Sequence, residues 1–377
     1  MAGLYIHIPF CTQKCIYCDF MSGTNLSLRQ DFMASLISEM DHYLDFFVDD
    51  PMRTIYFGGG TPSLLSVAEL QQIYSAISQR WDISSVEEFT LECNPDDLTE
   101  EYLCQLRTLP INRLSIGVQS FCDDELRWLN RRHTASEAFE AVQRAKKAGF
   151  ANITIDLMFA LPVQTINSLN HSIDKALELG VSHISAYSLM FEPDSKITKL
   201  MELNRLQPLD EDLAADMFEL LSTRLTSAGY EQYEISNYAK PNFHSRHNSG
   251  YWHGMRYLGL GPSAHSFDGE KRWSNIAHTI KYNAQFSTLH SPLSTQIEHL
   301  TPDERFNELV FTALRTKIGV DLHDLRLRFG EIRYNQLLHQ AQKYINAGNM
   351  QIINNRLSLT HSGIYISDSI ISDFMIV

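Results

Sequence analysis

The sequence contains no run of about 18 apolar residues, so we expect no membrane-spanning helix. It also lacks a block of basic residues: 31 Lys and Arg stand against 45 Asp and Glu, which gives a net charge of −14. An acidic chain of this kind is a poor candidate for binding nucleic acid. The opening residues, MAGLYIHIPF, show neither a basic stretch nor a small-residue cleavage site. We therefore expect no secretory signal and a cytoplasmic protein.

The cysteines do not form the even framework of a small disulfide-bonded protein. Of six, three crowd together as Cys11, Cys15 and Cys18, and the other three are scattered as Cys93, Cys104 and Cys122. In a cytoplasmic chain, a tight cysteine group is more often a metal site than a set of disulfides. We expect the scattered cysteines to act as small buried hydrophobic residues.

The first half of the chain alternates between strand-like and helix-like patterns. The expected strands are 4–9, 54–57, 88–93, 113–118, 152–158 and 183–190. The expected helices are 32–47, 67–79, 100–106, 136–148 and 168–179, the last two followed by Gly149 and Gly180 as helix stops. This alternation predicts a parallel sheet covered by helices. The pattern alone does not separate an open doubly wound sheet from a partial barrel.

Polar or ligating residues stand at the ends of five of these strands. The cysteine group follows the first strand, and three glycines at 58–60 follow the second. Glu92 ends the third strand, Gln119 lies just past the fourth, and Asp156 lies in the fifth. Because the carboxyl ends of parallel strands meet at one rim, we expect these residues to build one site.

The alternation fades after residue 190. We expect a helix at 210–227, a strand at 230–235 and then a loop-like segment rich in aromatics, His and Gly at 236–265. Thr301, Pro302 and Glu304 form a capping box with Pro at the first helical position. Helices at 303–317, 323–328 and 332–346 and a hairpin turning at Asn354–Asn355 resemble a winged-helix shape. From residue 301 onward eight Lys and Arg balance eight Asp and Glu, which favours a packing or partner module over a DNA-binding one.

The spacing of the clustered cysteines indicates the metal. Thiolates are soft ligands suited to Zn or Fe–S. A structural Zn site normally needs four protein ligands, and here only His7 could join the three cysteines. A 4Fe–4S cluster needs one thiolate per iron, so three cysteines leave one iron open to another ligand. The pattern therefore favours a 4Fe–4S cluster.

The chain resembles the radical-SAM superfamily, in which such a cluster binds S-adenosylmethionine. CTQKCIYCDF resembles the superfamily's cluster loop, and YFGGGTP its glycine motif after the second strand. The segments LECNPDDLT, GVQSF, LNRRH, RHNSGYW and YLGLGPSAHS resemble the branch similar to oxygen-independent coproporphyrinogen III oxidase. The resemblance implies an α/β fold, a partial (β/α)6 barrel with a smaller C-terminal helical, winged-helix-like domain. It divides the chain into a radical-SAM core at 1–235, a connecting segment at 236–300 and a C-terminal domain at 301–377.

The resemblance also implies the site residues. Cys11, Cys15 and Cys18 would hold the cluster. The residues implied to contact S-adenosylmethionine are Tyr5, Gly59, Gly60, Thr61, Glu92, Gln119, Arg131, Asp156 and Met190. Glycines let backbone approach a ligand, carboxylates accept from amino and hydroxyl groups, and Arg pairs with a carboxylate. Two plainer interpretations stay open: the glycine run is only a tight turn, and Arg131 is a surface charge beside Arg132.

His247, in RHNSGYW, has two interpretations. Histidine is a common axial ligand of haem iron, so His247 is a candidate haem ligand. It is equally a candidate for a hydrogen-bonded structural histidine.

Two features distinguish the functions known in this branch. The oxidases carry a further cysteine two residues after the third, where this chain has Phe20, and an extension before the cluster, whereas Cys11 stands near the start here. Both point to the haem-chaperone (HemW) type, which binds haem as cargo and passes it to an acceptor protein, with an electron donor for the cluster. An oxygen-independent coproporphyrinogen III oxidase, or a radical-SAM enzyme acting on another tetrapyrrole, are the alternatives.

Overall fold

The computed structural model describes residues 2–193, 195–288 and 294–376. Six parallel strands stand side by side in chain order, and further strands extend this sheet at both edges. The parallel strands are β1 (Ala2–Ile8), β2 (Met52–Gly59), β3 (Glu88–Cys93), β4 (Arg113–Gln119), β5 (Asn152–Phe159) and β6 (His183–Ser188). The expected six-strand core is thus present, with strand bounds within a few residues of the predicted ones.

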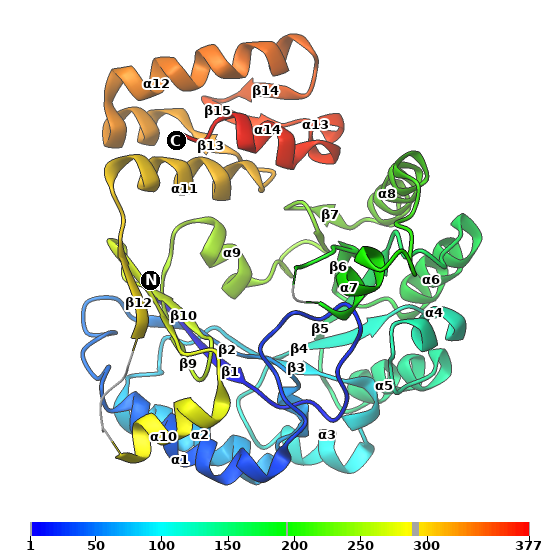
Figure 1. Ribbon diagram of the computed structural model, residues 1–377, viewed down its shortest axis with the longest axis vertical. Coiled ribbons are helices and arrows are strands. Elements are labelled where there is room, and N and C mark those ends of the chain that lie inside the picture. The colour runs from blue at the N-terminus through cyan, green and yellow to red at the C-terminus, as the bar shows by residue number, and fades with distance from the viewer. Residues whose placement is uncertain (1, 194, 289–293, 377) are drawn as a thin grey trace.

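Helices cover the outer side of the strands, as Figure 1 shows. They are α1 (Arg29–Met40), α2 (Val67–Arg80), α3 (Glu100–Leu106), α4 (Asp123–Trp128), α5 (Ala135–Lys147), α6 (Ile166–Leu179) and α8 (Glu211–Ser227). Capping boxes begin α2, α5 and α6, and Gly180 ends α6 in the left-handed conformation that favours glycine. The expected helix at 32–47 is shorter than predicted: α1 ends at Met40, and the buried Phe47 belongs to the turns that follow it.

The two faces of the strands differ in chemistry because successive side chains point to opposite sides. Leu4, Ile6, Ile55 and Phe57 point outward into the apolar core beneath the helices. The alternate positions are polar: Tyr56, Glu92, Arg113, Thr154 and Asp156 come from β2 to β5 and line one cavity of about 50 Å³. The inner side of the barrel is therefore a polar interior.

The segment expected as a connection is part of the main sheet. It contributes β8 (Asn237–Ala239), β9 (Arg256–Leu260), β10 (His265–Phe267), β11 (Lys271–Asn275) and β12 (Ser294–His299). Strand β9 pairs parallel to β1, β10 to β12 continue antiparallel, and β8 pairs antiparallel to β6. The strand expected at 230–235 is reduced to the two-residue β7 (Glu231–Gln232), which pairs with β8.

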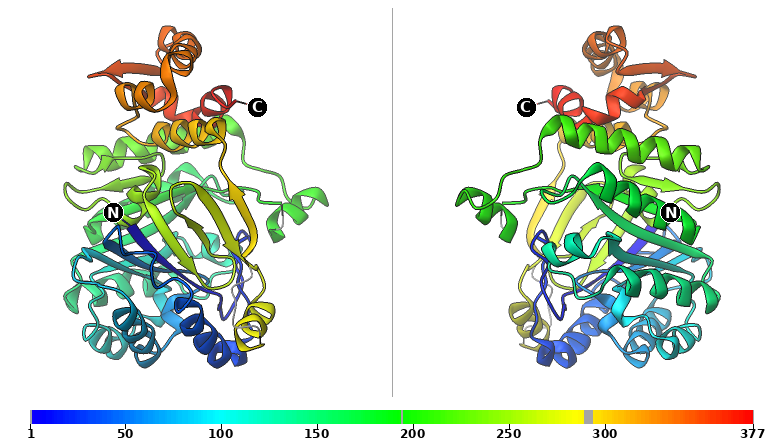
Figure 2. Two further views of the ribbon diagram at one scale, coloured as in Figure 1. Left: turned by 90° about the vertical axis from the view of Figure 1, so that its left-hand side faces the viewer. Right: turned by 90° about the vertical axis from the view of Figure 1, so that its right-hand side faces the viewer.

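Several helices lie where none was expected from the sequence, and two of them are close to the barrel. Residues expected in a loop form α9 (Arg246–Trp252), which Figure 1 shows on the inner side of the strands. A short α7 (Lys196–Glu202) follows β6 and projects from the body in Figure 2. Both helices have only seven residues, so most of their stability comes from packing against the rest of the protein and not from local propensity.

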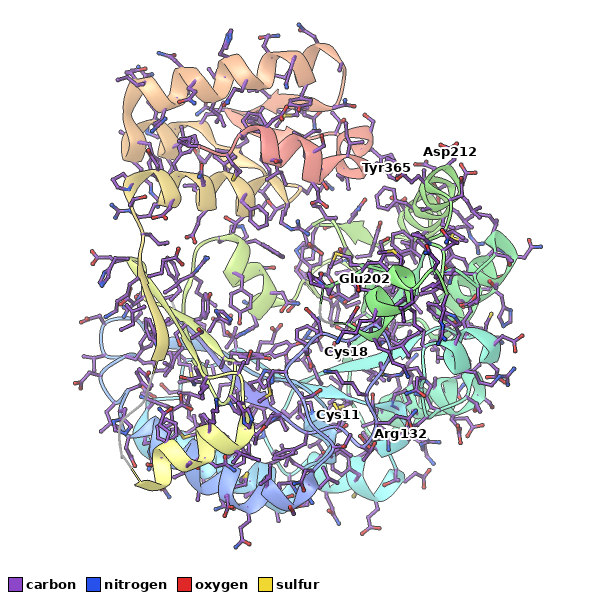
Figure 3. All side chains as sticks on the ribbon, in the orientation of Figure 1. Cys11, Cys18, Arg132, Glu202, Asp212 and Tyr365 are labelled. Carbon is purple, nitrogen blue, oxygen red and sulfur yellow. The ribbon has the colours of Figure 1, made fainter. Side chains whose placement is uncertain are left out.

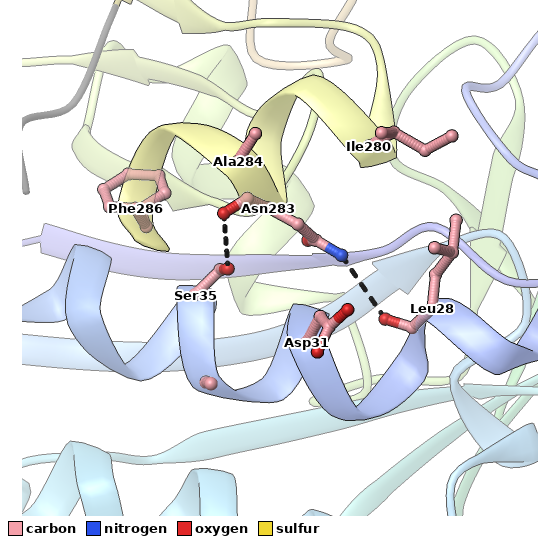
Figure 4. Close-up of a pocket in the computed structure, with 8 residues that line it drawn as sticks. Leu28, Asp31, Ser35, Ile280, Asn283, Ala284 and Phe286 are labelled. Atoms are coloured by element: carbon pink, nitrogen blue, oxygen red, sulfur yellow. Dashed lines mark hydrogen bonds between the residues drawn. The ribbon is translucent and has the colours of Figure 1, made fainter. Parts of the chain in front are cut away.

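Helix α10 (Thr279–Thr288) packs on α1 at the outer surface. Ser35 Oγ donates to the carbonyl of Asn283, and Asn283 Nδ2 donates to the carbonyl of Leu28, each over 3.4 Å (Figure 4). A cavity of about 400 Å³ lies between these helices. The described residues lining it include none of the predicted site residues, so this cavity lies apart from the predicted site.

The C-terminal part has a separate hydrophobic core and stacks on one end of the barrel (Figure 2). Its elements are α11 (Pro302–Leu314), β13 (Val320–Asp321), α12 (Leu322–Asn346), β14 (Met350–Ile353), β15 (Arg356–Leu359), α13 (His361–Tyr365) and α14 (Ser367–Asp373). The capping box at Thr301 is confirmed. Gly330, with φ +77°, interrupts α12 between the two predicted helices, and Asn354 and Asn355 turn the hairpin with positive φ.

No helix among the described residues is long and apolar enough to cross a membrane. All six cysteines lie in the described ranges and are free thiols. Cys93 is buried as expected and Cys122 partly so, but Cys104 is exposed, so the expectation of burial is wrong there.

Candidate functional site: the cysteine loop and the rim of the barrel

The cysteine loop leaves the end of β1 and folds back on itself. Gly23 N donates to the carbonyl of Pro9, and Cys11 N donates to the carbonyl of Gly23. Figure 3 shows Cys11 and Cys18 on this loop, at the end of the barrel where the parallel strands finish. Cys11 is buried, whereas Cys15 and Cys18 are partly exposed.

Two of the three thiols receive contacts from elsewhere in the barrel. Thr61 Oγ1 donates to Cys11 Sγ over 3.4 Å, and Arg131 Nη1 lies 3.4 Å from Cys15 Sγ. Among the described residues no three His, Cys, Asp or Glu side chains already gather as a metal site, so the three thiols share a loop without converging on one point. The donor set fits an iron–sulfur cluster through its soft thiols and through the guanidinium and hydroxyl directed at two of them.

His7 is not placed to complete a zinc site. His7 Nε2 donates to the carbonyl of Met21 over 2.7 Å, since a carbonyl only accepts. Its Nδ1 therefore accepts from the Tyr5 hydroxyl over 3.2 Å. With both ring nitrogens engaged, His7 holds the far end of the cysteine loop, and the thiols remain as the only candidate ligands in this group.

The glycine run binds this loop to the end of β2. Gly60 N donates to the carbonyl of Ile8 over 2.8 Å, and Thr61 N donates to that of Phe10 over 2.7 Å. A Cβ on Gly60 would lie 2.6 Å from the Phe10 carbonyl oxygen, and one on Gly59, whose φ is +103°, would lie 2.6 Å from the His7 ring. The glycines are thus required by the protein's own contacts. The contacts of the Gly59 and Gly60 backbone with S-adenosylmethionine stay predictions.

Glu92 and Asp156 face the polar interior. Glu92 accepts from the Tyr56 hydroxyl over 2.7 Å and from Gly59 N over 3.1 Å. Burial, together with repulsion from Asp156, raises the pKa of Glu92 to about 7. Burial raises the pKa of Asp156 to about 6, although neighbouring hydroxyl and guanidinium groups oppose the rise. Such carboxyls suit binding to the cationic and hydroxyl groups of a ligand.

Arg131 points inward, so its interpretation as a surface charge is wrong. Its Nη2 donates to the carbonyl of Gly117 over 2.6 Å and to Asn94 Oδ1 over 2.7 Å, while Nη1 reaches Cys15. Arg132 instead binds the partly exposed Asp96. Gln119 lies beside Arg131 at an irregularity in the pairing of β4 with β5, with the unusual φ of +71°. Such backbone strain is common where a site needs a side chain aimed in a particular direction.

Two predicted contacts lie at the margin of this arrangement. Tyr5 is half-buried inside the barrel and acts on the loop through His7. Met190 lies beyond the end of β6 with 64% of its surface exposed. The contact expected of Met190 stays a prediction.

His247 lies inside the protein, on α9. It is 1% exposed, and its Nδ1 and Nε2 hydrogen-bond with the Thr54 and Tyr251 hydroxyls, each over 2.8 Å. Burial lowers its pKa to about 3, so the ring is neutral. Because both nitrogens are engaged, this arrangement is that of a structural histidine. Binding of haem iron by His247 would require α9 to withdraw the ring from both hydroxyls.

Sequence reasoning missed several residues that complete the site. Tyr56 and Asn94 hold Glu92 and Arg131, and Arg113 closes the polar interior at the start of β4. Tyr56 stands two positions before Gly58, the first residue of the glycine run after the second strand, and Arg113 stands six positions before the predicted residue Gln119. The alternation of side chains along a strand could have placed these two on the inner face.

Comparisons with known proteins agree with this geometry. Residues 5–176 match the model of the Radical SAM superfamily, and residues 300–366 match that of the HemN C-terminal domain. A Lactococcus lactis protein named Heme chaperone HemW is 35% identical over 99% of this chain and 97% of its own length. A Bacillus subtilis protein of the same name is also 35% identical, over 100% of this chain and 99% of its own.

The chain belongs to the HemW family of radical-SAM proteins. Among solved structures, the coproporphyrinogen III oxidase HemN of Escherichia coli matches 99% of this chain and 89% of its own with a TM-score of 0.85. At 21% identity this likeness shows the fold alone: the radical-SAM core and C-terminal domain expected from the sequence. The 4Fe–4S cluster and S-adenosylmethionine are the cofactors that membership of the superfamily implies.

Proposed function

We propose that this protein is a cytoplasmic haem chaperone that binds haem and passes it to an acceptor protein. In this proposal Cys11, Cys15 and Cys18 hold a 4Fe–4S cluster, which receives an electron from a donor protein and binds S-adenosylmethionine. The observation that carries the proposal is similarity at 35% identity, across nearly the whole of both chains, to proteins named Heme chaperone HemW.

The polar rim supports a cofactor role for the core. When bound, the cluster and S-adenosylmethionine would supply radical chemistry. Arg131 places a positive charge beside the Cys15 sulfur, where it would offset part of the negative charge of a bound cluster. Glu92, positioned by Tyr56 and Gly59, would accept a hydrogen bond from the amino or ribose hydroxyl groups, as would Asp156.

A second candidate function is coproporphyrinogen III oxidation, which the fold likeness to HemN favours. Phe20, at the place of the oxidases' further cysteine, argues against it: its side chain is 61% exposed and has no group able to bind metal or move a proton. Anaerobic turnover of coproporphyrinogen III by the reconstituted protein tests this function, with an authentic oxidase as control. We expect no product, and decarboxylation over many turnovers would establish the oxidase.

Haem binding is tested directly by titrating haem into the full-length protein and following its absorption bands. We expect saturable binding near one haem per chain, followed by loss of haem to an added apo-haemoprotein. Binding that does not saturate, or haem that cannot be transferred, would contradict the chaperone function.

A further inference from the structure

Helix α9 enters the barrel at the end where the strands begin. Its first backbone N–H groups meet a buried carboxylate: Arg246 N and His247 N each donate to Glu88 over 2.9 Å. Glu88 is the first residue of β3 and is 2% exposed. A paired carboxylate at this depth fixes α9 in register with the strands, because separating the pair would leave a buried charge unsatisfied.

The His247 ring is held by three neighbouring side chains inside this end of the barrel. Besides its hydrogen bonds to Thr54 and Tyr251, it stacks on the Tyr56 ring with centroids 4.9 Å apart and planes 27° apart. Thr54 and Tyr56 are alternate inward-facing residues of β2. The imidazole is therefore fixed both in its plane and against the face of Tyr56.

Tyr56 carries this contact to the rim. Its hydroxyl donates to Glu92 Oε1, and Glu92 Oε2 accepts from Gly59 N at the end of β2. A continuous set of contacts thus runs from His247, near the start of the strands, to the carboxylate expected to contact S-adenosylmethionine. Because the imidazole of His247 stacks on the face of the Tyr56 ring, this ring has little freedom to tilt. The Tyr56 hydroxyl is therefore directed at one oxygen of the carboxylate.

Glycines on the two central strands provide the space for this arrangement. A Cβ on Gly3 of β1 would lie 2.9 Å from Thr54 Oγ1 and 3.3 Å from the His247 ring. A Cβ on Gly58 of β2 would lie 2.8 Å from the Tyr56 ring and 3.0 Å from Glu92 Oε1. The contacts of His247 with Thr54 and of Tyr56 with Glu92 therefore each require a neighbouring strand residue without a side chain, Gly3 and Gly58 respectively.

We propose that His247 is a positioning residue for the S-adenosylmethionine site, holding Tyr56 so that its hydroxyl fixes Glu92. The RHNSGYW segment then serves cofactor binding from the opposite end of the barrel and not by touching the ligand. This inference rests on the S-adenosylmethionine site of the proposed function, and it goes further in assigning a role to α9.

The test measures the affinity of S-adenosylmethionine for the anaerobically reconstituted full-length protein. The variants are His247→Ala, Tyr56→Phe and the two combined. Each single variant is expected to raise the Kd about tenfold, the effect of losing a hydrogen bond to a charged group. Both substitutions act through Glu92, so their effects should not add. The Kd of the combined variant is therefore expected to equal the higher of the two single-variant Kd values.

Two further variants separate positioning from stability. Tyr282→Phe is the matched control for Tyr56→Phe: Tyr282 is also fully buried and its hydroxyl also donates to a buried carboxylate, Glu39, over 2.6 Å, but it lies on α10, outside the contact set. It is expected to lower the melting temperature and leave the Kd unchanged. Thr54→Val keeps the imidazole and removes one of its partners, so it is expected to raise the Kd about threefold even where His247→Ala folds poorly.

The outcomes distinguish this inference from the proposed function. Wild-type affinity in His247→Ala and Thr54→Val would overturn the positioning role alone. Loss of haem affinity in His247→Ala with S-adenosylmethionine affinity intact would also overturn it, making His247 a haem ligand. Absence of S-adenosylmethionine binding by the wild-type protein would overturn the cofactor site itself.

Discussion

Arg131 connects two parts of the site that are far apart in sequence. Its guanidinium contacts Cys15 Sγ at 3.4 Å and the carbonyl of Gly117 at 2.6 Å, so one side chain fixes the cysteine loop to the end of β4. Its Nε is buried without a partner among the described residues, and the guanidinium is therefore held by its two terminal nitrogens.

Replacing Arg131 by Ala is expected to weaken both ligands of the site. We expect faster loss of iron from the reconstituted protein and about a tenfold rise in the Kd of S-adenosylmethionine, because the positive charge beside Cys15 is lost. Iron release to a chelator and isothermal titration measure the two effects. Arg132→Ala, which removes a partly exposed pair with Asp96, is the control. Equal behaviour of the two variants would rule out the inward role of Arg131.

Replacing Cys15 by Ala is expected to abolish the cluster. A 4Fe–4S cluster held by three thiolates does not tolerate the loss of one, so iron and sulfide per chain should fall to the background level. Cys104→Ala is the control, since Cys104 is an exposed thiol outside the loop. Unchanged iron and sulfide content in Cys15→Ala would show that the cluster assignment is wrong.

The affinity for S-adenosylmethionine is expected to rise with pH between about 5 and 8. The pKa values of Glu92, about 7, and Asp156, about 6, mean that both carboxyls lose protons in this range. The ligand carries sulfonium and ammonium charges, which bind the ionised forms more strongly. The affinity should therefore increase as each group ionises and level off above about pH 8, where both carboxyls are ionised. Glu92→Gln should remove the upper part of the rise, and an affinity that falls with pH would contradict the prediction.

Glu39 is expected to make stability depend on pH. This carboxyl of α1 is fully buried and accepts from Gly261 N over 2.8 Å and from the Tyr282 hydroxyl over 2.6 Å. Burial raises its pKa from 4.5 to about 7. Its contribution to stability is therefore complete below about pH 4.5 and declines as pH rises through 7. Glu39→Gln should reduce the fall in melting temperature between pH 5 and 8.

The control for Glu39 is Glu270→Gln, because Glu270 is exposed. Glu39→Ala leaves the same donors without an acceptor and should destabilise the fold by about 2–4 kcal/mol, measured by denaturant unfolding. A pH profile of Glu39→Gln that matches the wild type would show that Glu39 does not titrate in this range.

The sequence predicted most of what depends on neighbouring residues in the chain. The six parallel strands, the capping box at Thr301, the break near Gly330 and the turn at Asn354–Asn355 all follow from local pattern and local backbone preference. The convergence of the cysteine loop, Glu92 and Gln119 at one rim followed from strand order, because parallel strands end on the same side. The place of Arg131 at this rim was implied only by the family resemblance.

The tertiary structure alone decided how these residues are held. The helix α9 has no periodic signal of its own, since Glu88 and the space left by Gly3 specify its position. The need for glycine at position 59 comes from the ring of His7, which lies on another strand. The neutral state of His247 and the raised pKa values of Glu92 and Asp156 come from burial. Burial depends on the packing of the whole barrel. The sequence pattern therefore indicates which side chains lie together, but it does not determine their protonation states.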